Sequence, residues 1–552
     1  MATKRGMASA RPVDDEQARF TDSPVSKDPV EDVSPTEEPM SGTTELHGPD
    51  LEQGVPSADV ADGGMLLGHA GGEPVLVVRR GLALYGISAT CSHYGGALAE
   101  GILVGDTVRC PLHHACFDLR TGRASAPAFR SLTCWKVEER GARVSVTGKV
   151  EPVALGAAAG TLPKHVVVVG GGAAGFAAVD TLRRERYEGS VTLVTADSAA
   201  PYDRPNVSKD FLAGTALAEW MPMRPLEEYS SDHIDLRLAK KVGSIDARAR
   251  KVILDTGESI PFDALLLATG ADPIRLSVPG GDLPHVAHVR TLADGEAIIA
   301  RCATARRAVV IGASFIGLEV AAALRTRGID VHVIAPDPPL SRVLGPELSA
   351  FVRQVHEEHG VEFSIGVTAT EITEREVRLS DGRSLAADLV VVGIGVRPAL
   401  SLAQSAGLAV DRGVVVNEHM ETSVPGIYAA GDIARWPDAR TKRSLRVEHW
   451  VVAQRQGQVA ARNILNQRVS YEDVPFFWSQ HYDVTINYVG HVEKLEGVQV
   501  VGSVSDRDCL VAYREGDRIA AVATIGRNRA SLAAEVLFRR DDQAGLEALL
   551  RA

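Results

Sequence analysis

Two cysteines and two histidines are spaced as metal ligands often are. Cys91 and His93 flank a single residue, Cys110 and His113 flank two, and sixteen residues separate the two pairs. Thiolate sulfur and imidazole nitrogen both bind transition metals, and four such ligands suit a tetrahedral zinc ion. The pairs belong to two separate loops, so the spacing predicts a metal centre where those loops meet.

One cysteine and one histidine on each loop also meet the needs of an iron–sulfur centre. A Rieske [2Fe–2S] cluster is held by two sulfurs on one iron and two nitrogens on the other. Gly95, Gly96 and Pro111 allow the tight turns that bring the loops together. Residues 47–150, with the trailing segment ACFDLRTG, resemble Rieske ferredoxin domains. The resemblance predicts a Rieske cluster held by the two pairs, with zinc as the alternative.

The residues beside these ligands differ from the membrane-complex type of Rieske protein. That type has an extra cysteine in each loop, and here Gly96 and Leu112 occupy those positions, which resembles the soluble, lower-potential branch. His114 stands where such domains usually have glycine, and we expect it to be a neighbour of the cluster that adjusts polarity or access. Cys116 and Cys134 are expected to be small buried packing residues.

A glycine-rich turn further along the chain predicts a dinucleotide site. Gly170, Gly172 and Gly175 follow the apolar run VVVV and open a helix. Glycines at these positions allow the turn, let the backbone approach a pyrophosphate, and let the helix pack on the strand. Asp197, 22 residues beyond Gly175, is placed for a ribose hydroxyl.

A second turn of this kind is less regular. Gly312 and Gly317 keep the outer positions, but Ser314 replaces the middle glycine. Ala335 stands near the end of the next strand, where an acid would bind the ribose of NAD, and Asp337 comes two residues late. The turn predicts a nicotinamide nucleotide site, and the choice between NAD and NADP stays open.

The segments DALLLATGADP (263–273) and TSVPGIYAAGDIA (422–434) complete a resemblance to the pyridine nucleotide–disulfide oxidoreductase superfamily over about residues 164–550. There is no cysteine between 135 and 301, so the redox disulfide of the disulfide reductases has no counterpart. The segment PYDRPNVSKDFL (201–212) instead resembles ferredoxin and rubredoxin reductases and apoptosis-inducing-factor-like proteins. With a Rieske domain ahead of it, the chain resembles the Rieske-containing, apoptosis-inducing-factor-like branch.

This resemblance implies roles for individual residues. Gly170, Gly172, Gly175 and Asp197 match the FAD pyrophosphate and ribose site, and Gly312 and Gly317 the NAD(P) site. The flavin-lining positions are Arg204, Pro205 and Lys209, with Asp432 on the ribityl chain and Trp450 near the isoalloxazine. Glu319 matches a carboxylate near the nicotinamide that pairs with the lysine at Lys209, and these two are the predicted catalytic pair. For the polar residues among them, a surface ion pair is the alternative.

The chain is therefore predicted to be a multidomain protein: an N-terminal antiparallel β Rieske domain, then an α/β flavoprotein with two dinucleotide-binding domains and a C-terminal α+β interface domain. The predicted segments are a disordered acidic tail (1–46), the Rieske domain (47–150), a linker (151–163), the FAD-binding domain (164–289 and 413–463), the NAD(P)-binding domain (290–412) and the C-terminal domain (464–552). The tail holds ten acids against five bases and has little apolar surface to bury. His481, in the C-terminal domain, is expected to be structural.

Composition limits the cellular compartments and the classes of partner that we expect for this protein. The 552 residues carry a net charge of −12, which argues against general affinity for nucleic acid. Six clustered cysteines favour a reducing compartment. We find neither an apolar run of the ~18 residues that a membrane helix needs nor the apolar core of a signal peptide. These observations predict a cytoplasmic protein that binds neither nucleic acid nor membrane.

The cofactors together predict a direction of electron flow. A nicotinamide gives up two electrons as a hydride, a [2Fe–2S] cluster takes one at a time, and flavin connects the two. We expect electrons to pass from NAD(P)H through FAD to the Rieske cluster and then to an unknown one-electron acceptor, a protein or a small molecule. The alternatives are a nucleotide-responsive redox sensor of apoptosis-inducing-factor type and the reductase component of a Rieske oxygenase. The family's C-terminal domain often mediates dimerisation, so a homodimer is a further expectation.

Overall fold

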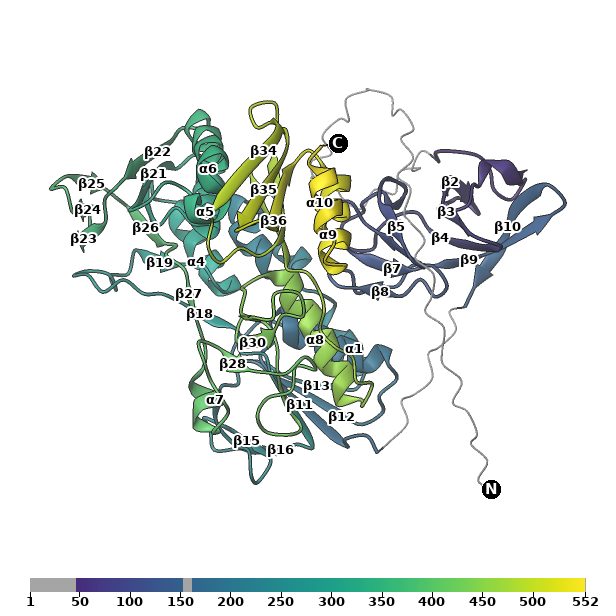
Figure 1. Ribbon diagram of the computed structural model, residues 1–552. Coiled ribbons are helices and arrows are strands. Elements are labelled where there is room, and N and C mark those ends of the chain that lie inside the picture. The colour runs from purple at the N-terminus through teal and green to yellow at the C-terminus, as the bar shows by residue number, and fades with distance from the viewer. Residues whose placement is uncertain (1–45, 152–160, 552) are drawn as a thin grey trace, which may run out of the picture. The chain divides into compact units, whose positions relative to one another are not determined.

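The computed structural model describes residues 46–151 and 161–551, and all of them belong to one compact unit that spans Thr44–Ala552 (Figure 1). The predicted acidic tail, apart from Leu46, and residues 152–160 of the predicted linker lie outside the described residues. Among the residues that are described, no helix combines the length and the apolar composition that crossing a bilayer requires.

The N-terminal β domain consists of two antiparallel sheets. The first has the order β1-β10-β9-β4-β3-β2, with β1 (Val55–Pro56), β2 (Met65–Ala70), β3 (Glu73–Arg80), β4 (Ala83–Ser88), β9 (Cys134–Arg140) and β10 (Arg143–Val150). The second has the order β5-β6-β7-β8, with β5 (Ile102–Val104), β6 (Thr107–Arg109), β7 (Cys116–Asp118) and β8 (Ala124–Ser125). Val75 and Val77 of β3 enter one core and Leu76 and Val78 the other, because successive side chains of a strand point to opposite faces.

The first α/β domain is built on a parallel five-stranded sheet. Its order is β13-β12-β11-β17-β29, with β11 (His165–Val169), β12 (Ser190–Val194), β13 (Ile234–Arg237), β17 (Ala264–Leu267) and β29 (Ile427–Ala429). Strands buried on both faces read as continuous apolar runs, which explains the VVVV of β11. Helices α1 (Ala173–Arg184) and α8 (Trp450–Ile464) lie side by side (Figure 1). They pack so closely that a Cβ at Gly457 would lie 2.2 Å from the carbonyl oxygen of Ala174.

The second α/β domain repeats this plan. Its parallel sheet has the order β19-β26-β20-β21-β22, with β19 (Val286–His288), β20 (Arg307–Ile311), β21 (Asp330–Ala335), β22 (Val361–Ile365) and β26 (Leu389–Val392). Its main helices are α4 (Leu292–Cys302), α5 (Phe315–Thr326) and α6 (Ser341–Glu358).

Short elements complete the two α/β domains. The small sheets contain β14 (Val242–Asp246), β15 (Lys251–Leu254) and β16 (Ser259–Pro261); β18 (Ala271–Pro273) and β27 (Val396–Pro398); β23 (Ala369–Ile372), β24 (Glu376–Leu379) and β25 (Ser384–Ala386); and β28 (Val414–Val415), β30 (Ala434–Pro437) and β31 (Ser444–Leu445). The short helices are α2 (Asp210–Ala213), α3 (Leu226–Ser231) and α7 (Ser401–Ser405). The 3₁₀ turns, including two in the N-terminal domain, are η1 (Ser57–Asp59), η2 (Leu98–Glu100), η3 (Arg204–Ser208) and η4 (Ala218–Trp220).

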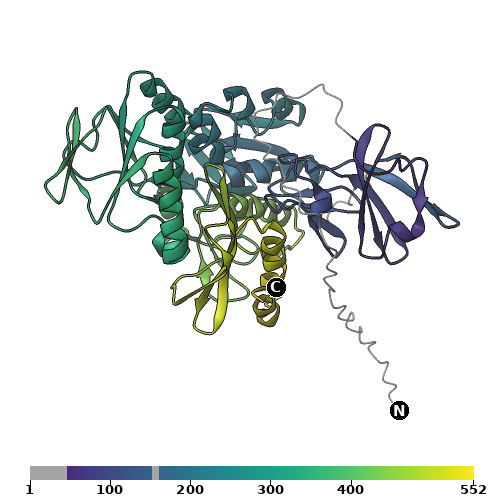
Figure 2. The ribbon, with the colours of Figure 1, turned by 90° about the horizontal axis from the view of Figure 1, so that it is seen from above.

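The C-terminal domain is an antiparallel sheet followed by two helices. The sheet has the order β32-β33-β36-β35-β34, with β32 (Phe476–His481), β33 (Val484–Gly490), β34 (Gly497–Ser503), β35 (Asp508–Glu515) and β36 (Arg518–Ile525). Helix α9 (Asn528–Arg539) contacts β33 and β36 on one side and β5 of the N-terminal domain on the other (Figures 1 and 2). Helix α10 (Gln543–Leu549) ends the described chain.

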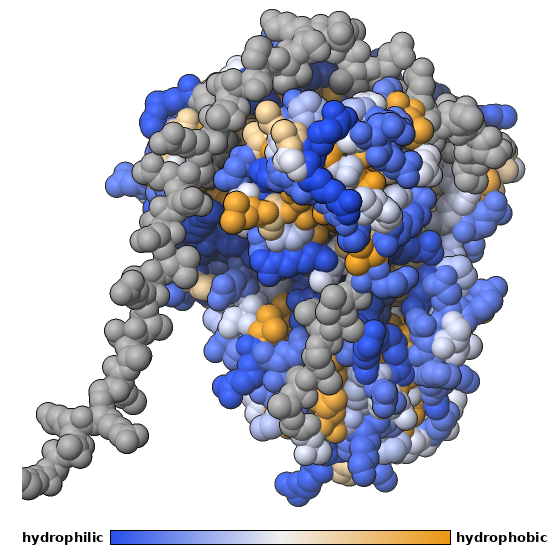
Figure 3. Space-filling view, turned by 90° about the vertical axis from the view of Figure 1, so that its right-hand side faces the viewer, coloured by the Kyte–Doolittle hydropathy of each residue, from blue (hydrophilic) through white to orange (hydrophobic). Residues whose placement is uncertain are grey.

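These elements agree with the predicted fold class, a β domain followed by an α/β flavoprotein and a C-terminal α+β domain. The face that carries the N-terminal β domain is largely hydrophilic, with hydrophobic residues scattered over it (Figure 3). Leu82, in the turn between β3 and β4, is an exposed apolar residue of that domain.

Candidate redox site

Two loops of the N-terminal β domain present the predicted metal ligands. In the first loop, the amide of Gly95 donates to the carbonyl of Cys91 at 3.0 Å, and in the second, the amide of Cys110 donates to the carbonyl of Ala115 at 2.8 Å. A Cβ at Gly96 would lie 2.8 Å from the Sγ of Cys110. Glycine at position 96 is therefore what lets the two loops approach each other.

The two predicted sulfur ligands are adjacent and buried. Cys91 is 3% exposed and Cys110 is 1% exposed. The hydrogen bond between the two thiols raises the pKa of Cys91 and lowers the pKa of Cys110. Two sulfurs side by side form the pair that one iron of a [2Fe–2S] cluster needs.

The two predicted nitrogen ligands also form a pair. The rings of His93 and His113 lie edge to face with their centroids 5.1 Å apart. Burial lowers the pKa of His93 to about 3 and the pKa of His113 well below its usual range, so both are neutral, the form that binds metal. The Nδ1 of His93 is buried and has no hydrogen-bond partner among the described residues, which leaves that nitrogen free to ligate.

The arrangement of the four side chains bears on the zinc alternative. Among the described residues, no three His, Cys, Asp or Glu side chains converge on a single ion position. The sulfurs form one pair and the nitrogens another, an arrangement that suits the two irons of a [2Fe–2S] cluster.

The cluster loops touch the segment predicted to line the flavin. The ring of His113 lies 4.3 Å from that of Trp478 on β32, measured between centroids. The hydroxyl of Tyr94 donates to the carboxylate of Asp203, the residue that precedes η3. Burial raises the pKa of both Tyr94 and Asp203. Sequence reasoning missed Trp478 and Tyr94, because neither belongs to a motif.

The first glycine-rich turn has the form of a phosphate cradle. A Cβ at Gly170 would lie 2.2 Å from the carbonyl oxygen of Ala268, and a Cβ at Gly175 would lie 1.8 Å from that of Gly170. Gly172 instead faces open space, where the nearest atom to an added Cβ is a guanidinium nitrogen of Arg204 at 4.0 Å. A pyrophosphate fits there, between the start of α1 and a cation.

The remaining predicted FAD residues lie at the same end of this sheet. The Oδ2 of Asp432 accepts from Nη2 of Arg290 at 2.9 Å, and Nη1 of Arg204 donates to the carbonyl of Arg290 at 2.5 Å. Asp197, after β12, accepts a hydrogen bond of 2.8 Å from the hydroxyl of Tyr202. Burial lowers the pKa of Arg204.

Lys209 and Glu319 lie in contact, with Nζ 2.9 Å from Oε2. Glu319, on α5, is 4% exposed and also accepts from the hydroxyls of Ser208 at 2.7 Å and Ser479 at 3.0 Å. The Nζ of Lys209 lies 3.3 Å from the carbonyl oxygen of Pro205. This carboxylate thus joins the first α/β domain, the second and the C-terminal domain at one point.

A line of hydrogen bonds continues from Ser479 into the protein. The Oγ of Ser479 lies 3.3 Å from Nε2 of His481, whose Nδ1 lies 3.1 Å from Nε2 of His356. Because Ser479 donates its only hydroxyl proton to Glu319, His481 donates to Ser479 and accepts from His356. Burial lowers the pKa of His481 to about 3 and that of His356 to about 2, so both rings are neutral.

In the second glycine-rich turn, Ser314 has a structural role in place of the middle glycine. A Cβ at Gly312 would lie 2.4 Å from the carbonyl oxygen of Gly393, and a Cβ at Gly317 would lie 2.1 Å from that of Gly312. The hydroxyl of Ser314 accepts from the amide of Gly317 at 3.2 Å and donates to the carbonyl of Gly393 at 2.7 Å. Ser314 is thus the N-cap of α5.

Four further residues from the sequence analysis can be placed. Trp450 is the first residue of α8 and is half-buried. The late acid, Asp337, pairs with Arg342 at 2.6 Å. Cys134 is buried as expected, but Cys116, the first residue of β7, is only half-buried.

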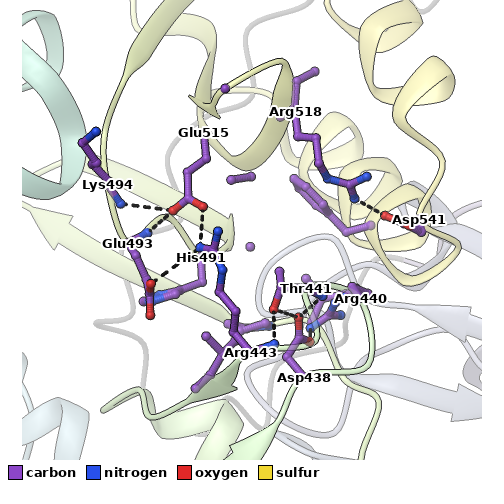
Figure 4. A pocket seen from close by; sticks show the side chains of 18 of the residues that line it. Asp438, Arg440, Thr441, Arg443, His491, Glu493, Lys494, Glu515, Arg518 and Asp541 are labelled. Carbon is purple, nitrogen blue, oxygen red and sulfur yellow. Dashed lines mark hydrogen bonds and ion pairs between the residues drawn. The ribbon is translucent and has the colours of Figure 1, made fainter.

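A charged cavity of about 640 Å³ lies elsewhere in the C-terminal domain (Figure 4). Its charges pair with one another, as in Arg443 with Glu515 at 2.8 Å and Lys494 with Glu496 at 2.7 Å. Arg518 pairs with Asp541 across the same cavity. None of the predicted cluster, FAD or NAD(P) residues lines this cavity.

Three family profiles match consecutive parts of the chain. Pyridine nucleotide-disulphide oxidoreductase matches residues 164–457. Rieske [2Fe-2S] domain matches residues 54–136, and Reductase C-terminal matches residues 476–550.

Individual proteins resemble the chain over most of its length. Apoptosis-inducing factor 3 of Homo sapiens is 32% identical over 502 residues, which cover 87% of this chain and 82% of that protein. Rhodocoxin reductase of Rhodococcus erythropolis is 36% identical over 379 residues, 68% of this chain and 89% of that protein. The crystal structure of the covalent putidaredoxin reductase-putidaredoxin complex is 35% identical with a TM-score of 0.67, covering 70% of this chain and 95% of that one.

Proposed function

Because this chain belongs to the pyridine nucleotide-disulphide oxidoreductase family, as an FAD-dependent NAD(P)H oxidoreductase with its own Rieske domain, we propose a route for its electrons. The Rieske cluster takes the electrons of NAD(P)H by way of FAD and passes them to a separate one-electron acceptor. The family matches confirm the predicted cofactors, which are FAD, NAD(P)H and the [2Fe–2S] cluster. The route beyond the flavin is the proposal.

One observation carries this route: the cluster loops contact the C-terminal domain and the segment predicted to line the flavin. His113 lies against Trp478, and Tyr94 donates to Asp203, which directly precedes Arg204. These contacts support a route on which an electron passes from the flavin to the cluster.

The electron balance is simple. NAD(P)H and two oxidised acceptors yield NAD(P)⁺, two reduced acceptors and one proton. Bound flavin accepts a hydride and releases single electrons, and Rieske potentials at about −150 mV or above make the transfer to the cluster downhill. The protein itself contributes placement, fixed charges and the exclusion of water.

We assign the residues of this path as follows. Cys91, His93, Cys110 and His113 hold the cluster; Gly170, Gly172, Gly175, Asp197, Arg204, Pro205, Asp432 and Trp450 surround FAD; and Gly312 and Gly317 bind the nicotinamide nucleotide. Lys209 and Glu319 hold the nicotinamide and flavin in register through their 2.9 Å contact. The proposal leaves open whether the second α/β domain binds NADH or NADPH as the electron donor.

The acceptor class follows by analogy with relatives. The putidaredoxin reductase structure holds that enzyme with putidaredoxin. In this chain the Rieske domain takes the place of a first protein acceptor, so the external acceptor meets the cluster. Homodimerisation and a cytoplasmic location stay predictions, which sedimentation velocity and cell fractionation measure.

Replacing Cys110 by serine tests the route. We expect Cys110→Ser to abolish the reduction of cytochrome c while NAD(P)H still bleaches the flavin at the wild-type rate. Cys116→Ser is the matched control, because Cys116 lies in the same domain and is half-buried. Cytochrome c reduction that persists in Cys110→Ser would exclude the cluster from the path. Flavin reduction too slow for turnover in the wild type would instead favour a nucleotide-responsive sensor.

A further inference from the structure

His114 is buried between the Rieske domain and the C-terminal domain. Its backbone has a φ of 58°, a conformation that favours glycine, and its side chain is 0% exposed. Both ring nitrogens have partners: Nδ1 lies 2.5 Å from Oε2 of Glu535, and Nε2 lies 3.1 Å from Oγ of Ser531. The ring stacks on Phe476, with centroids 3.9 Å apart and planes 13° apart. A histidine next to a predicted cluster ligand thus forms two side-chain hydrogen bonds and a ring stack with another domain.

Glu535 gathers charges from three elements. It belongs to α9 and is fully buried, and its Oε1 lies 2.9 Å from Nη1 of Arg455 on α8 and 3.0 Å from Nη1 of Arg109 on β6. Burial alone would raise the pKa of Glu535, but the two guanidinium groups outweigh burial and hold it well below its usual range. The carboxylate is therefore ionised, and it ties the Rieske domain to both helices.

Arg455 extends the contact along the cluster loop. Its Nη2 donates to the carbonyl of His114 at 3.3 Å, and its Nε donates to the carbonyl of Ala126 at 3.4 Å. The amide of Ala126 in turn donates to Oε1 of Gln458, also on α8, at 3.2 Å. Arg455 and Gln458 thus find these partners only when the Rieske domain is docked in this position.

The position that these contacts select has His113 against Trp478. His113 directly precedes His114 in the chain, and Trp478 lies two residues beyond Phe476 on β32. The stack of His114 on Phe476 therefore sets the neighbouring contact of the predicted ligand.

We propose that His114 and Glu535 are positioning residues that keep the Rieske domain permanently docked, so that each electron reaches the cluster without any movement of that domain. The proposal rests on the proposed function and adds how its central step is organised. One electron moves per transfer, and no bond forms or breaks in the interface.

His114→Gly is the variant that tests this role. Glycine accepts a φ of 58° without strain, and Glu535 keeps both arginine partners. His233→Gly is the matched control, because His233 has a φ of 54° but is exposed in the first α/β domain. Ser531→Val perturbs the same interface from α9 without altering the cluster loop, so it serves if His114→Gly lowers cluster content.

Stopped-flow absorbance on the full-length holoprotein separates the two steps. In His114→Gly we expect NAD(P)H to reduce the flavin at the wild-type rate and the cluster to be reduced at least about tenfold more slowly. The slowed step should depend on solvent viscosity, because the domain must now find its place by diffusion. In the wild type and His233→Gly the cluster rate should be independent of viscosity.

Hydrogen–deuterium exchange provides a readout that needs no turnover. In the oxidised protein without NAD(P)H, residues 110–115 and α9 should exchange about tenfold faster in His114→Gly than in His233→Gly. Unchanged exchange and an unchanged cluster rate, with the EPR signal of the cluster intact, would overturn the proposal. A wild-type cluster that NAD(P)H never reduces would defeat the proposed function instead, and the exchange result would still decide whether the domain is locked.

Discussion

Strand β32 turns one face to the Rieske domain and the other to the second α/β domain. Phe476 and Trp478 contact His114 and His113 of the Rieske domain. The residues between and after them, Phe477, Ser479 and His481, contact Phe315, Glu319 and His356 of the second α/β domain. Because side chains alternate along a strand, six residues suffice to reach both neighbours.

The two faces differ in their chemistry. Behind the Rieske face lies an ionised carboxylate with two guanidinium groups, all buried. The other face has neutral imidazoles in a line of hydrogen bonds, with a single ion pair between Lys209 and Glu319 at its end. The comparison links the charged face to the proposed docking of the Rieske domain and the other face to the predicted catalytic pair, Lys209 and Glu319.

The largest expected effect is the loss of stability when Glu535, on the charged face, is replaced. Glu535→Ala leaves Arg455 and Arg109 buried without a counter-charge, which should cost about 3–5 kcal/mol of stability. Differential scanning calorimetry of the holoprotein measures it as a lowered unfolding temperature. Glu547→Ala, on α10 with a partly exposed pair to Arg514, is the control and should have little effect. Equal losses in the two variants would mean that the interface charges do not fix the domain.

A smaller effect, on the rate of flavin reduction, tests the role of the face toward the second α/β domain. Glu319→Gln removes the ion pair with Lys209 but keeps the size of the side chain, so flavin reduction by NAD(P)H should slow by about tenfold or more. Stopped-flow measurement should show the flavin-to-cluster step unchanged. Glu357→Gln, an exposed position on α6, is the control. A cluster rate that falls as far as the flavin rate would show that the two faces are not separate.

The smallest expected effect is on the pH dependence of the unfolding temperature. His356 and His481 have folded pKa values of about 2 and about 3, below the ~6.5 of an unfolded histidine, so the unfolded chain binds more protons. The contribution of these two neutral rings to the free energy of unfolding is complete above about pH 6.5. It is lost as the pH falls, by up to ~1.4 kcal/mol per pH unit for each ring. Unfolding temperatures at pH 7.5 and 5.5 should diverge less in His356→Gln and His481→Gln than in His47→Gln, an exposed control. A divergence that is the same in all three would assign the acid sensitivity to other groups.

The Rieske cluster and the glycine-rich turns could be predicted from sequence, because their chemistry depends on spacing within one or two short segments. The antiparallel and parallel sheets could also be predicted, since β11 contains the run VVVV and β3 lies between turns. Ser314 looked like a defect in a motif, and the structure shows a helix cap instead.

The docking of the Rieske domain could not be predicted. His114 was expected to be a neighbour of the cluster that adjusts polarity or access, but its partners Ser531 and Glu535 belong to a helix at the far end of the chain. No local pattern reports a contact over that separation. The segment FFWSQH likewise gave no sign that its two faces meet different domains, because both faces are covered by residues from elsewhere.

The order of synthesis follows from that separation. His114 and Glu535 are 421 residues apart, so the ribosome completes the cluster loop long before it makes the helix that covers it. At the usual speed of translation the delay is roughly 20–85 s. Helix α9 therefore cannot cover His114 until nearly the whole chain has been made.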